Sequence, residues 1–377
     1  MKVLNLSKYF PPYPGGIENI ACDLVEELAG RGVFETVLSH GDKEYPGSSI
    51  NQVLSASYGE LLYAPISPSF PFKLHKELKS GRYDLLHVHL PNVSAFWPLL
   101  MKVDIPIVLH WHADVIFPED KQFCRAAYKF YAFFERALLK KAAAIVPTST
   151  PYLEHSAPLQ EFRHKCSVIP LGLDFSRMAE LPDTALIETK RRWTGEEYSF
   201  LVVAAGRFSH YKGFSYLIEA AAGLEGVKIV IAGDGEERAG LLQLVDELGL
   251  ADKVVLPGRL TDHDLHLLMA CCDAFCLPSV ERSEAFGVVL LEAMFYGRPL
   301  ITTEINGSAT SWVNRAGETG LTIPVGDSAA LAEAIKQLRD DPQLCARFGR
   351  AGRIRLEKNF TISKTADKFY RLYSGLL

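Results

Sequence analysis

The chain has 377 residues, of which 48% are apolar and 23% are charged. A single hydrophobic core seldom supports this length, so we expect two domains. The formal net charge of −5 argues against binding to nucleic acid. Seven cysteines without a repeated metal-ligand spacing, and no apolar run near the roughly 20 residues that span a bilayer, lead us to expect a cytoplasmic protein without disulfides.

Short apolar runs rich in β-branched residues alternate with amphipathic stretches along the chain. This alternation predicts parallel sheets with helices on both faces. The predicted strands are residues 2–7, 33–40, 84–89, 106–111, 144–148 and 166–169 in the first half, and 200–205, 228–233, 254–256, 274–277 and 299–303 in the second. The fold class we expect is therefore α/β, with two Rossmann-like, doubly wound domains facing across a cleft.

The two sets of strands are separated by "SVIPLGLDFSRMAELPD", in which Pro170, Gly172 and Pro182 interrupt regular structure. We place the boundary near Leu171, which gives domains 1–171 and 172–377. The last segment, 361–377, is predicted to form an amphipathic helix that could pack on either domain.

The first loop, "KYFPPYPGGIEN", ends in Gly15 and Gly16 just before a predicted helix. Paired glycines allow a backbone to approach an anion at a helix N-terminus, although a simple tight turn has the same pattern. A later loop, "PIVLHWHADVIF", carries His110, His112 and Asp114 at a strand end. "HVH" on a neighbouring strand repeats the alternation without cysteine or glutamate partners, so we predict no metal.

Residues 121–144 mix aromatic residues with Lys and Arg on one predicted helix. Such a helix can rest on an anionic membrane, or it can be a core helix with a solvated basic face. Both interpretations stay open.

In the second half, "GRFSHYKG" places Arg207 and Lys212 after a buried strand, where two cations suit a diphosphate better than they suit an ordinary basic loop. "AGDG" after the next strand is a weak glycine-loop signal, in which Asp234 caps a helix or contacts a ligand. Arg259 and Leu260 follow a third strand and are candidates for contact with a nucleotide base.

The stretch "EAFGVVLLE" contains two carboxylates, Glu284 and Glu292, around a helix start at Gly287. Helix amides can bind phosphate, and carboxylates accept hydrogen bonds from vicinal hydroxyls. The alternative is that Glu292 is an ordinary helix residue, but its apolar neighbours make an unpartnered carboxylate costly. The pattern favours a ligand with a sugar, a diphosphate and a ribose.

These motifs together resemble the retaining nucleotide-sugar glycosyltransferases of family 4, which have the GT-B architecture. "PGGIE", "HAD", "GRFSHYKG", "AGDG", "EAFGVVLLE" and "GRPLITT" occur in the order found in that family. Residues 306–327, "NGSATSWVNRAGETGLTIPVGD", are similar to a subset that includes bacterial mannosyl- and rhamnosyltransferases of surface polysaccharide synthesis.

The resemblance implies a set of site residues. Arg207 and Lys212 would bind the diphosphate, Glu284 the donor sugar, Glu292 the ribose diol, Gly15 and Gly16 the diphosphate from the first domain, and His112 and Asp114 the region of the transferred sugar. Backbone groups of Ala285, Phe286, Gly287 and Val288 would meet the sugar and phosphate, with Ala285 standing where glycine is frequent in the family.

The implied reaction is the transfer of a hexose, with retention, to a hydroxyl of a glycan or a lipid-linked glycan. GDP-mannose is the first donor we expect and a UDP-sugar the second, with no cofactor and no metal. A nucleotide-sugar epimerase of the same fold and a non-catalytic nucleotide-binding module remain alternatives. A nicotinamide dehydrogenase should show Gly-x-Gly-x-x-Gly with a later acidic residue, and neither half has this set.

Overall fold

The protein is described by a computed structural model that covers residues 1–13, 15–46, 50–61, 64–115 and 122–377, without the side chains of residues 61 and 122–127. The chain divides into two compact units. One comprises Met1–Gly172 together with Ile362–Leu377, and the other is Leu173–Thr361. The observed boundary lies next to Leu171, and the last helix, whose position the sequence left open, belongs to the first unit.

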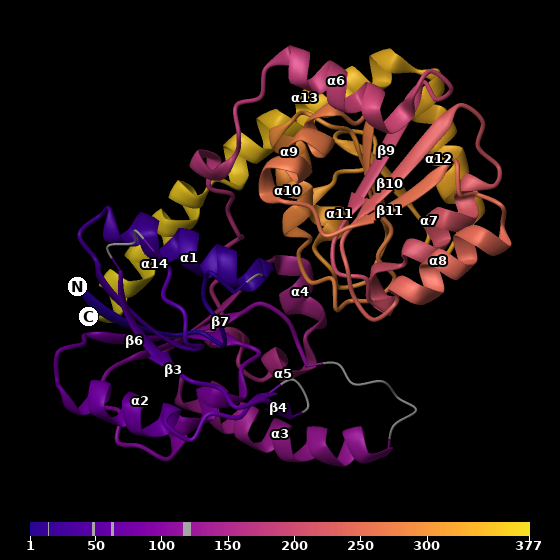
Figure 1. The fold of residues 1–377 in the computed structure, drawn as a ribbon. Coiled ribbons are helices and arrows are strands. Elements are labelled where there is room, and N and C mark those ends of the chain that lie inside the picture. The colour runs from indigo at the N-terminus through magenta and orange to yellow at the C-terminus, as the bar shows by residue number, and fades with distance from the viewer. Residues whose placement is uncertain (14, 47–49, 62–63, 116–121) are drawn as a thin grey trace. The chain divides into compact units, whose positions relative to one another are not determined.

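The first unit is built on a six-stranded parallel sheet in the order β3-β2-β1-β6-β7-β8 (Figure 1). Its strands are β1 (Lys2–Leu6), β2 (Phe34–His40), β3 (Asn51–Ser55), β6 (Leu85–Leu90), β7 (Ile107–Trp111) and β8 (Ala144–Pro147). Its other elements are α1 (Gly16–Ala29), a hairpin of β4 (Glu60–Leu61) and β5 (Ala64–Pro65), α2 (Phe70–Lys79), η1 (Val93–Leu99), α3 (Gln122–Lys141), α4 (Thr150–His155), α5 (Ala157–Gln160), η2 (Arg163–Lys165) and α14 (Ile362–Leu376).

The second unit repeats this design, with the order β11-β10-β9-β12-β13-β14 and parallel pairing throughout. Its strands are β9 (Phe200–Ala205), β10 (Val227–Ala232), β11 (Val254–Gly258), β12 (Ala274–Leu277), β13 (Leu300–Thr303) and β14 (Gly320–Ile323). Its helices are η3 (Phe175–Arg177), α6 (Asp183–Thr194), η4 (His210–Lys212), α7 (Phe214–Ala221), α8 (Arg238–Glu247), α9 (Asp262–Cys271), α10 (Val288–Phe295), α11 (Thr310–Val313), α12 (Ser328–Asp340) and α13 (Pro342–Asn359). The expected α/β class with two Rossmann-like domains is confirmed.

Two strand predictions need correction. Residues 166–169 were predicted as a strand, but Cys166 forms only an isolated bridge with Ile145. The sixth strand of the first sheet is instead β3, and β14 was not predicted at all. Both are edge strands, and "NQVLS" and "GLTI" are too short and too mixed in polarity to show the pattern of a buried parallel strand.

Each sheet contains one position at which the strand order reverses. In the first unit the chain runs outward from β1 to β2 and β3, and then resumes on the other side of β1 with β6. In the second unit the same reversal separates β9 from β12. Ligands of open parallel sheets bind outside the carboxyl ends of the strands at such a switch point. The loops after β9 and β12 are therefore the first place to look for a site.

The helix α14 covers part of one face of the first sheet and packs beside α1 (Figure 1). Its residues Phe369 and Tyr373 are fully buried against Val3, Leu85 and Val108 of three neighbouring strands. Among the described residues, no helix combines the length and apolar character that crossing a membrane requires.

Four buried histidines lie on the same face, and we call His87, His89, His110 and His112 the histidine file. The His87 and His89 ring centroids are 4.5 Å apart, those of His110 and His112 are 4.0 Å apart, and Tyr373 Oη lies 2.7 Å from His87 Nδ1. Ring nitrogens of His87, His89 and His110 lie within 4.8 Å of one another. This spacing would also allow a metal ion, while the rings themselves are stacked or tilted with inter-plane angles of 20–40°. The absence of a metal stays a prediction.

Burial lowers the pKa of every histidine in the file, that of His89 to about 3, so all four are neutral near pH 7. Below about pH 6.5 the unfolded chain binds protons on these histidines and the folded protein does not. Each histidine therefore lowers the free energy of unfolding by about 1.4 kcal/mol for every pH unit of acidification. Burial has the opposite effect on Glu35 and Glu135, whose pKa it raises to about 8. The folded protein keeps their protons while the unfolded chain releases them, so these two groups lower the free energy of unfolding as the pH rises from about 4.5 to 8.

We therefore predict that the first unit is most stable near pH 6.5 and loses stability steeply on acidification, because four histidines then outweigh two carboxyls. Replacing His110 with Phe should keep the stack and make the acid limb shallower by about 1.4 kcal/mol per pH unit. Urea unfolding between pH 5 and 8 measures both slopes. Equal acid limbs for the two proteins would contradict a neutral, buried His110.

Candidate active site

The site begins with a buried ion pair between Lys212 and Glu284. Lys212 Nζ lies 2.5 Å from Glu284 Oε2, and each side chain is only 10% exposed. Burial by itself lowers the pKa of Lys212, but the Glu284 carboxylate outweighs it and raises the pKa above its usual value. The lysine therefore stays charged in a place that excludes most water.

The pair joins two loops at the switch point of the second sheet. Lys212 ends η4 in the loop after β9, and Glu284 lies in the loop after β12. The amide of Val280 donates to the Tyr211 carbonyl over 2.8 Å. Gly213 has a left-handed φ of 64°, and a Cβ there would collide with the Pro278 carbonyl. The loops are thus fixed to each other by their backbones.

Glu284 is held at several atoms. Ser279 Oγ donates to Glu284 Oε2 over 2.9 Å, and Ser308 Oγ donates to the Glu284 carbonyl over 2.5 Å. The other carboxylate oxygen, Oε1, accepts no hydrogen bond from the described residues. Sequence reasoning found Glu284 but missed Ser279, which stands directly after Pro278 in "LPSVERSE".

Arg207 differs from Lys212 in exposure. Its side chain is 64% exposed, and its Nε lies 3.5 Å from Glu236 Oε2, which is also exposed. Burial raises the pKa of Tyr211, and the charges of Lys212, Glu284 and Arg207 all act on its hydroxyl. The charges of the three predicted side chains therefore all reach Tyr211, with Lys212 buried and Arg207 exposed and paired with Glu236.

Residues 285–288 lead from Glu284 into α10. Ala285, Phe286 and Gly287 are buried, and Gly287 precedes the first helical residue, Val288, with a left-handed φ of 79°. The start of α10 thus lies in the loop that carries Glu284, as predicted. Glu292 is half-buried further along α10, and its charge is one cause of the raised pKa of Tyr296, about 12, after burial.

The glycines of "AGDG" have a packing role. A Cβ at Gly233 would collide with the Gly206 carbonyl, and a Cβ at Gly235 with the Phe208 backbone. The Phe208 amide donates to the Asp234 carbonyl over 2.9 Å. Asp234 Oδ1 accepts from the Gly235 amide, while the residue before α8 is Glu237, so Asp234 does not cap that helix as suggested.

Arg259 and Leu260 follow β11, which is an edge strand of the second sheet. Arg259 is exposed and Leu260 is half-buried. Thr261 caps α9 by accepting from the Asp264 amide over 3.1 Å. The contact of Arg259 and Leu260 with a base stays a prediction.

The remaining predicted residues belong to the first unit. Gly15 precedes α1, and Gly16, the first residue of that helix, has no atom within 4 Å of where its Cβ would be. His112 Nε2 lies 3.0 Å from His89 Nδ1. Asp114 Oδ1 accepts from Trp111 Nε1 over 2.8 Å and from Ser156 Oγ over 2.6 Å, so Asp114 fixes its own loop. Ligand contacts at these positions stay predictions.

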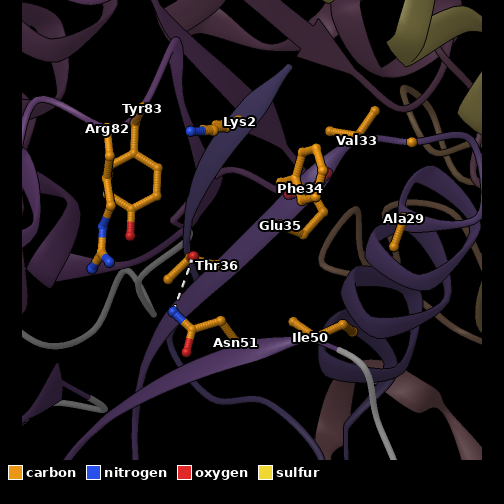
Figure 2. A pocket seen from close by; sticks show the side chains of 11 residues that line it. Lys2, Ala29, Val33, Phe34, Glu35, Thr36, Ile50, Asn51, Arg82 and Tyr83 are labelled. Carbon is orange, nitrogen blue, oxygen red and sulfur yellow. Dashed lines mark hydrogen bonds between the residues drawn. The ribbon is translucent and has the colours of Figure 1, made fainter.

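A pocket of about 450 Å³ opens elsewhere on the first unit (Figure 2). Lys2, Phe34 and Asn51, the first residues of β1, β2 and β3, line it together with Tyr83. It therefore lies at the amino ends of these strands, opposite the edge that carries Gly16 and His112, and it contains none of the predicted site residues.

Comparisons with known proteins agree with this geometry. Residues 14–177 match the family model "Glycosyltransferase Family 4", and residues 187–355 match "Glycosyl transferases group 1". The chain is 32% identical to O-antigen chain mannosyltransferase C of Escherichia coli, over 100% of this chain and 99% of the relative. It is 33% identical to D-rhamnosyltransferase WbpZ of Pseudomonas aeruginosa, over 96% and 92%.

A solved structure of HepE from Anabaena, in complex with UDP and glucose, matches the fold with a TM-score of 0.80 over the full length of both chains, at 22% identity. This likeness supports the GT-B fold. The match to the family model and the identity above 30% to these two full-length relatives show that the chain belongs to the family 4 glycosyltransferases.

Proposed function

We propose that this glycosyltransferase moves mannose from GDP-mannose to a hydroxyl of a glycan or lipid-linked glycan, with retention at the anomeric carbon and without a metal ion. The observation that carries the proposal is the buried Lys212–Glu284 pair beside the exposed Arg207, at the switch point of the second sheet. The two relatives that match nearly the whole chain at more than 30% identity, a mannosyltransferase and a rhamnosyltransferase by name, favour mannose.

The central physical task is to stabilise the negative charge that grows on the departing diphosphate. Fixed cations in a poorly hydrated site do this without reorganising during the reaction. In the proposal, Lys212 and Arg207 bind the diphosphate, and the first-turn amides of α10, near Phe286, Gly287 and Val288, bind a phosphate oxygen.

The remaining proposed donor contacts come from two carboxylates of the second unit and from two residues of the first unit. Glu284 accepts hydrogen bonds from the sugar hydroxyls through Oε1, and Glu292 accepts them from the ribose diol. From the first unit, Gly16 approaches the diphosphate and His112 contacts the transferred sugar. These roles extend the family's pattern onto the matching residues of this chain.

We propose attack from the face on which the leaving group departs. The bond from the anomeric carbon to the diphosphate oxygen breaks, a bond to the acceptor oxygen forms, and the acceptor proton passes to the departing phosphate. Glu284 need not be the nucleophile, because this route forms no covalent glycosyl-enzyme intermediate. No second carboxylate is then needed.

Incubation with GDP-mannose and an alkyl mannoside acceptor should give a disaccharide whose new linkage is α, like the donor, with release of GDP. Excess EDTA should leave the rate unchanged, because the cations are Lys212 and Arg207. Proton NMR of the product and a GDP assay measure both. A β linkage would contradict retention, loss of rate in EDTA would contradict a metal-independent reaction, and faster turnover of a UDP-sugar would contradict GDP-mannose as the donor. An isomerised nucleotide sugar would indicate an epimerase.

The two cations should respond differently to substitution. Arg207→Ala and Lys212→Met should each weaken GDP binding by about 10- to 100-fold, because each removes a charge-assisted hydrogen bond of roughly 1.5–3 kcal/mol. Only Lys212→Met should also destabilise the fold, by roughly 3–5 kcal/mol, because it leaves Glu284 charged and unpaired. Calorimetric titration and urea unfolding measure the two effects.

Two further variants control this comparison. Arg191, an exposed arginine of α6 in an ion pair with Glu196, is the matched control, and Arg191→Ala should leave GDP binding unchanged. Lys212→Met combined with Glu284→Gln should recover most of the lost stability without recovering activity. Normal GDP affinity in both Arg207→Ala and Lys212→Met would disprove the diphosphate assignment.

We also propose that the described part of α3 lets the enzyme reach a lipid-linked acceptor at an anionic membrane. Lys121, the first residue of the basic and aromatic stretch in the sequence, lies outside the described residues. Phe130 and Phe133 are 70% and 71% exposed, and Lys129 and Lys140 are exposed near them. The η1 segment packs against α3 and is followed by the exposed Leu100. Exposed aromatic residues beside lysines suit the interface of an anionic bilayer.

Phe130→Ala combined with Phe133→Ala should therefore lower cosedimentation with vesicles that contain phosphatidylglycerol by about tenfold. Vesicles of phosphatidylcholine alone should bind little of either protein, because the lysines then have no anionic partner. Phe34, 69% exposed at the start of β2, offers the matched control, and Phe34→Ala should sediment like the wild type. Recovery of the wild type in the supernatant with anionic vesicles would refute the membrane contact.

A further inference from the structure

The two oxygens of the Glu284 carboxylate have different surroundings. Oε2 receives Lys212 Nζ at 2.5 Å and Ser279 Oγ at 2.9 Å, while Oε1 has no donor among the described residues. A carboxylate oxygen has two lone-pair directions, so these two donors saturate Oε2. The free oxygen is the one that can serve a ligand.

We propose that Ser279 is a positioning residue, which fixes the rotation of the Glu284 carboxylate so that Oε1 faces the hydroxyls of the donor sugar. The inference rests on the proposed function. Lys212 alone does not fix this rotation, because an ammonium group on a flexible stem can follow the carboxylate as it turns. A second donor from a different direction is required, and Ser279 supplies it.

Ser279 is suited to this role because its backbone is immobile. It is fully buried, its carbonyl accepts a hydrogen bond from Thr303 Oγ1 of the neighbouring strand β13, and the next amide, that of Val280, is bonded to Tyr211. The hydroxyl has a single partner in the described structure, Glu284. Because the backbone of Ser279 is fixed and its hydroxyl has one partner, the positions of β12 and β13 determine where the Glu284 carboxylate is held.

The role is specific to the sugar part of the donor. Ser279 has no place in the proposed diphosphate site, so its loss should leave the affinity for GDP unchanged. It should instead reduce the additional affinity and turnover that the sugar provides. A displacement of a substrate-positioning group by about 1 Å can lower a rate by about 100-fold.

The test compares Ser279→Ala with Ser279→Thr, which keeps the hydroxyl, and with Thr302→Val. The last variant removes an equally buried hydroxyl of β13 that is bonded to Asn314 and to neither Ser279 nor Glu284. For each protein, GDP and GDP-mannose affinities are measured by calorimetry, and kcat/KM for GDP-mannose is measured in the transfer assay. Ser279→Ala should bind GDP normally, bind GDP-mannose about tenfold more weakly, and lose about 10- to 100-fold in kcat/KM. Ser279→Thr should recover at least part of this loss, and Thr302→Val should keep both affinities.

Several results would overturn the proposal. If Ser279→Ala keeps the wild-type ratio of GDP-mannose to GDP affinity, Ser279 does not position Glu284. If Thr302→Val loses the sugar affinity to the same extent, the effect comes from general loosening of the second sheet. If the wild type transfers no sugar but still binds GDP-mannose better than GDP, the proposed function fails, while the affinity ratio continues to test Ser279. If the wild type binds neither, both proposals fail.

Discussion

The Lys212–Glu284 pair is the constraint that shapes the second unit's ligand loops. A charge buried without a partner is very unfavourable, so the loops after β9 and β12 must keep this pair together. Gly213 allows the backbones to approach, and the bond from Val280 to Tyr211 fixes their alignment. The pair would therefore exist before any ligand arrives, and a ligand would meet charges whose positions are already set.

The charge balance explains why Lys212 alone is not sufficient to attract a diphosphate. Lys212 and Glu284 together carry no net charge, so a diphosphate that meets only this pair finds little net attraction. Arg207 adds the missing positive charge from an exposed position, where its weak contact with Glu236 is easily replaced. In the proposed reaction, the buried pair provides geometry, while Arg207 and the start of α10 provide the net field.

The sequence could place the candidate site residues in adjacent loops because that placement depends on topology. Parallel strands bring their following loops to one edge, so Arg207, Lys212 and Glu284 could be placed together from two strand ends, those of β9 and β12. Other features depend on contacts between residues distant in the sequence, which no local pattern contains. These are the Lys212–Glu284 ion pair, the bond from Ser279 to Glu284, and the packing of Gly233 and Gly235. The edge strands β3 and β14 were missed for a related reason, since an edge strand is only partly buried and lacks a continuous apolar run.

The first unit is completed by the far end of the chain. Tyr373 and Phe369 of α14 cover the histidine file, and Tyr373 Oη reaches His87. His87 stacks on His89, and His89 Nδ1 contacts His112 Nε2. A continuous series of contacts therefore connects the last helix to the histidine proposed to meet the transferred sugar. One ring nitrogen of His112 is engaged with His89 and the other, Nδ1, is buried, so the orientation of the ring depends on the packing of the histidine file, which α14 covers.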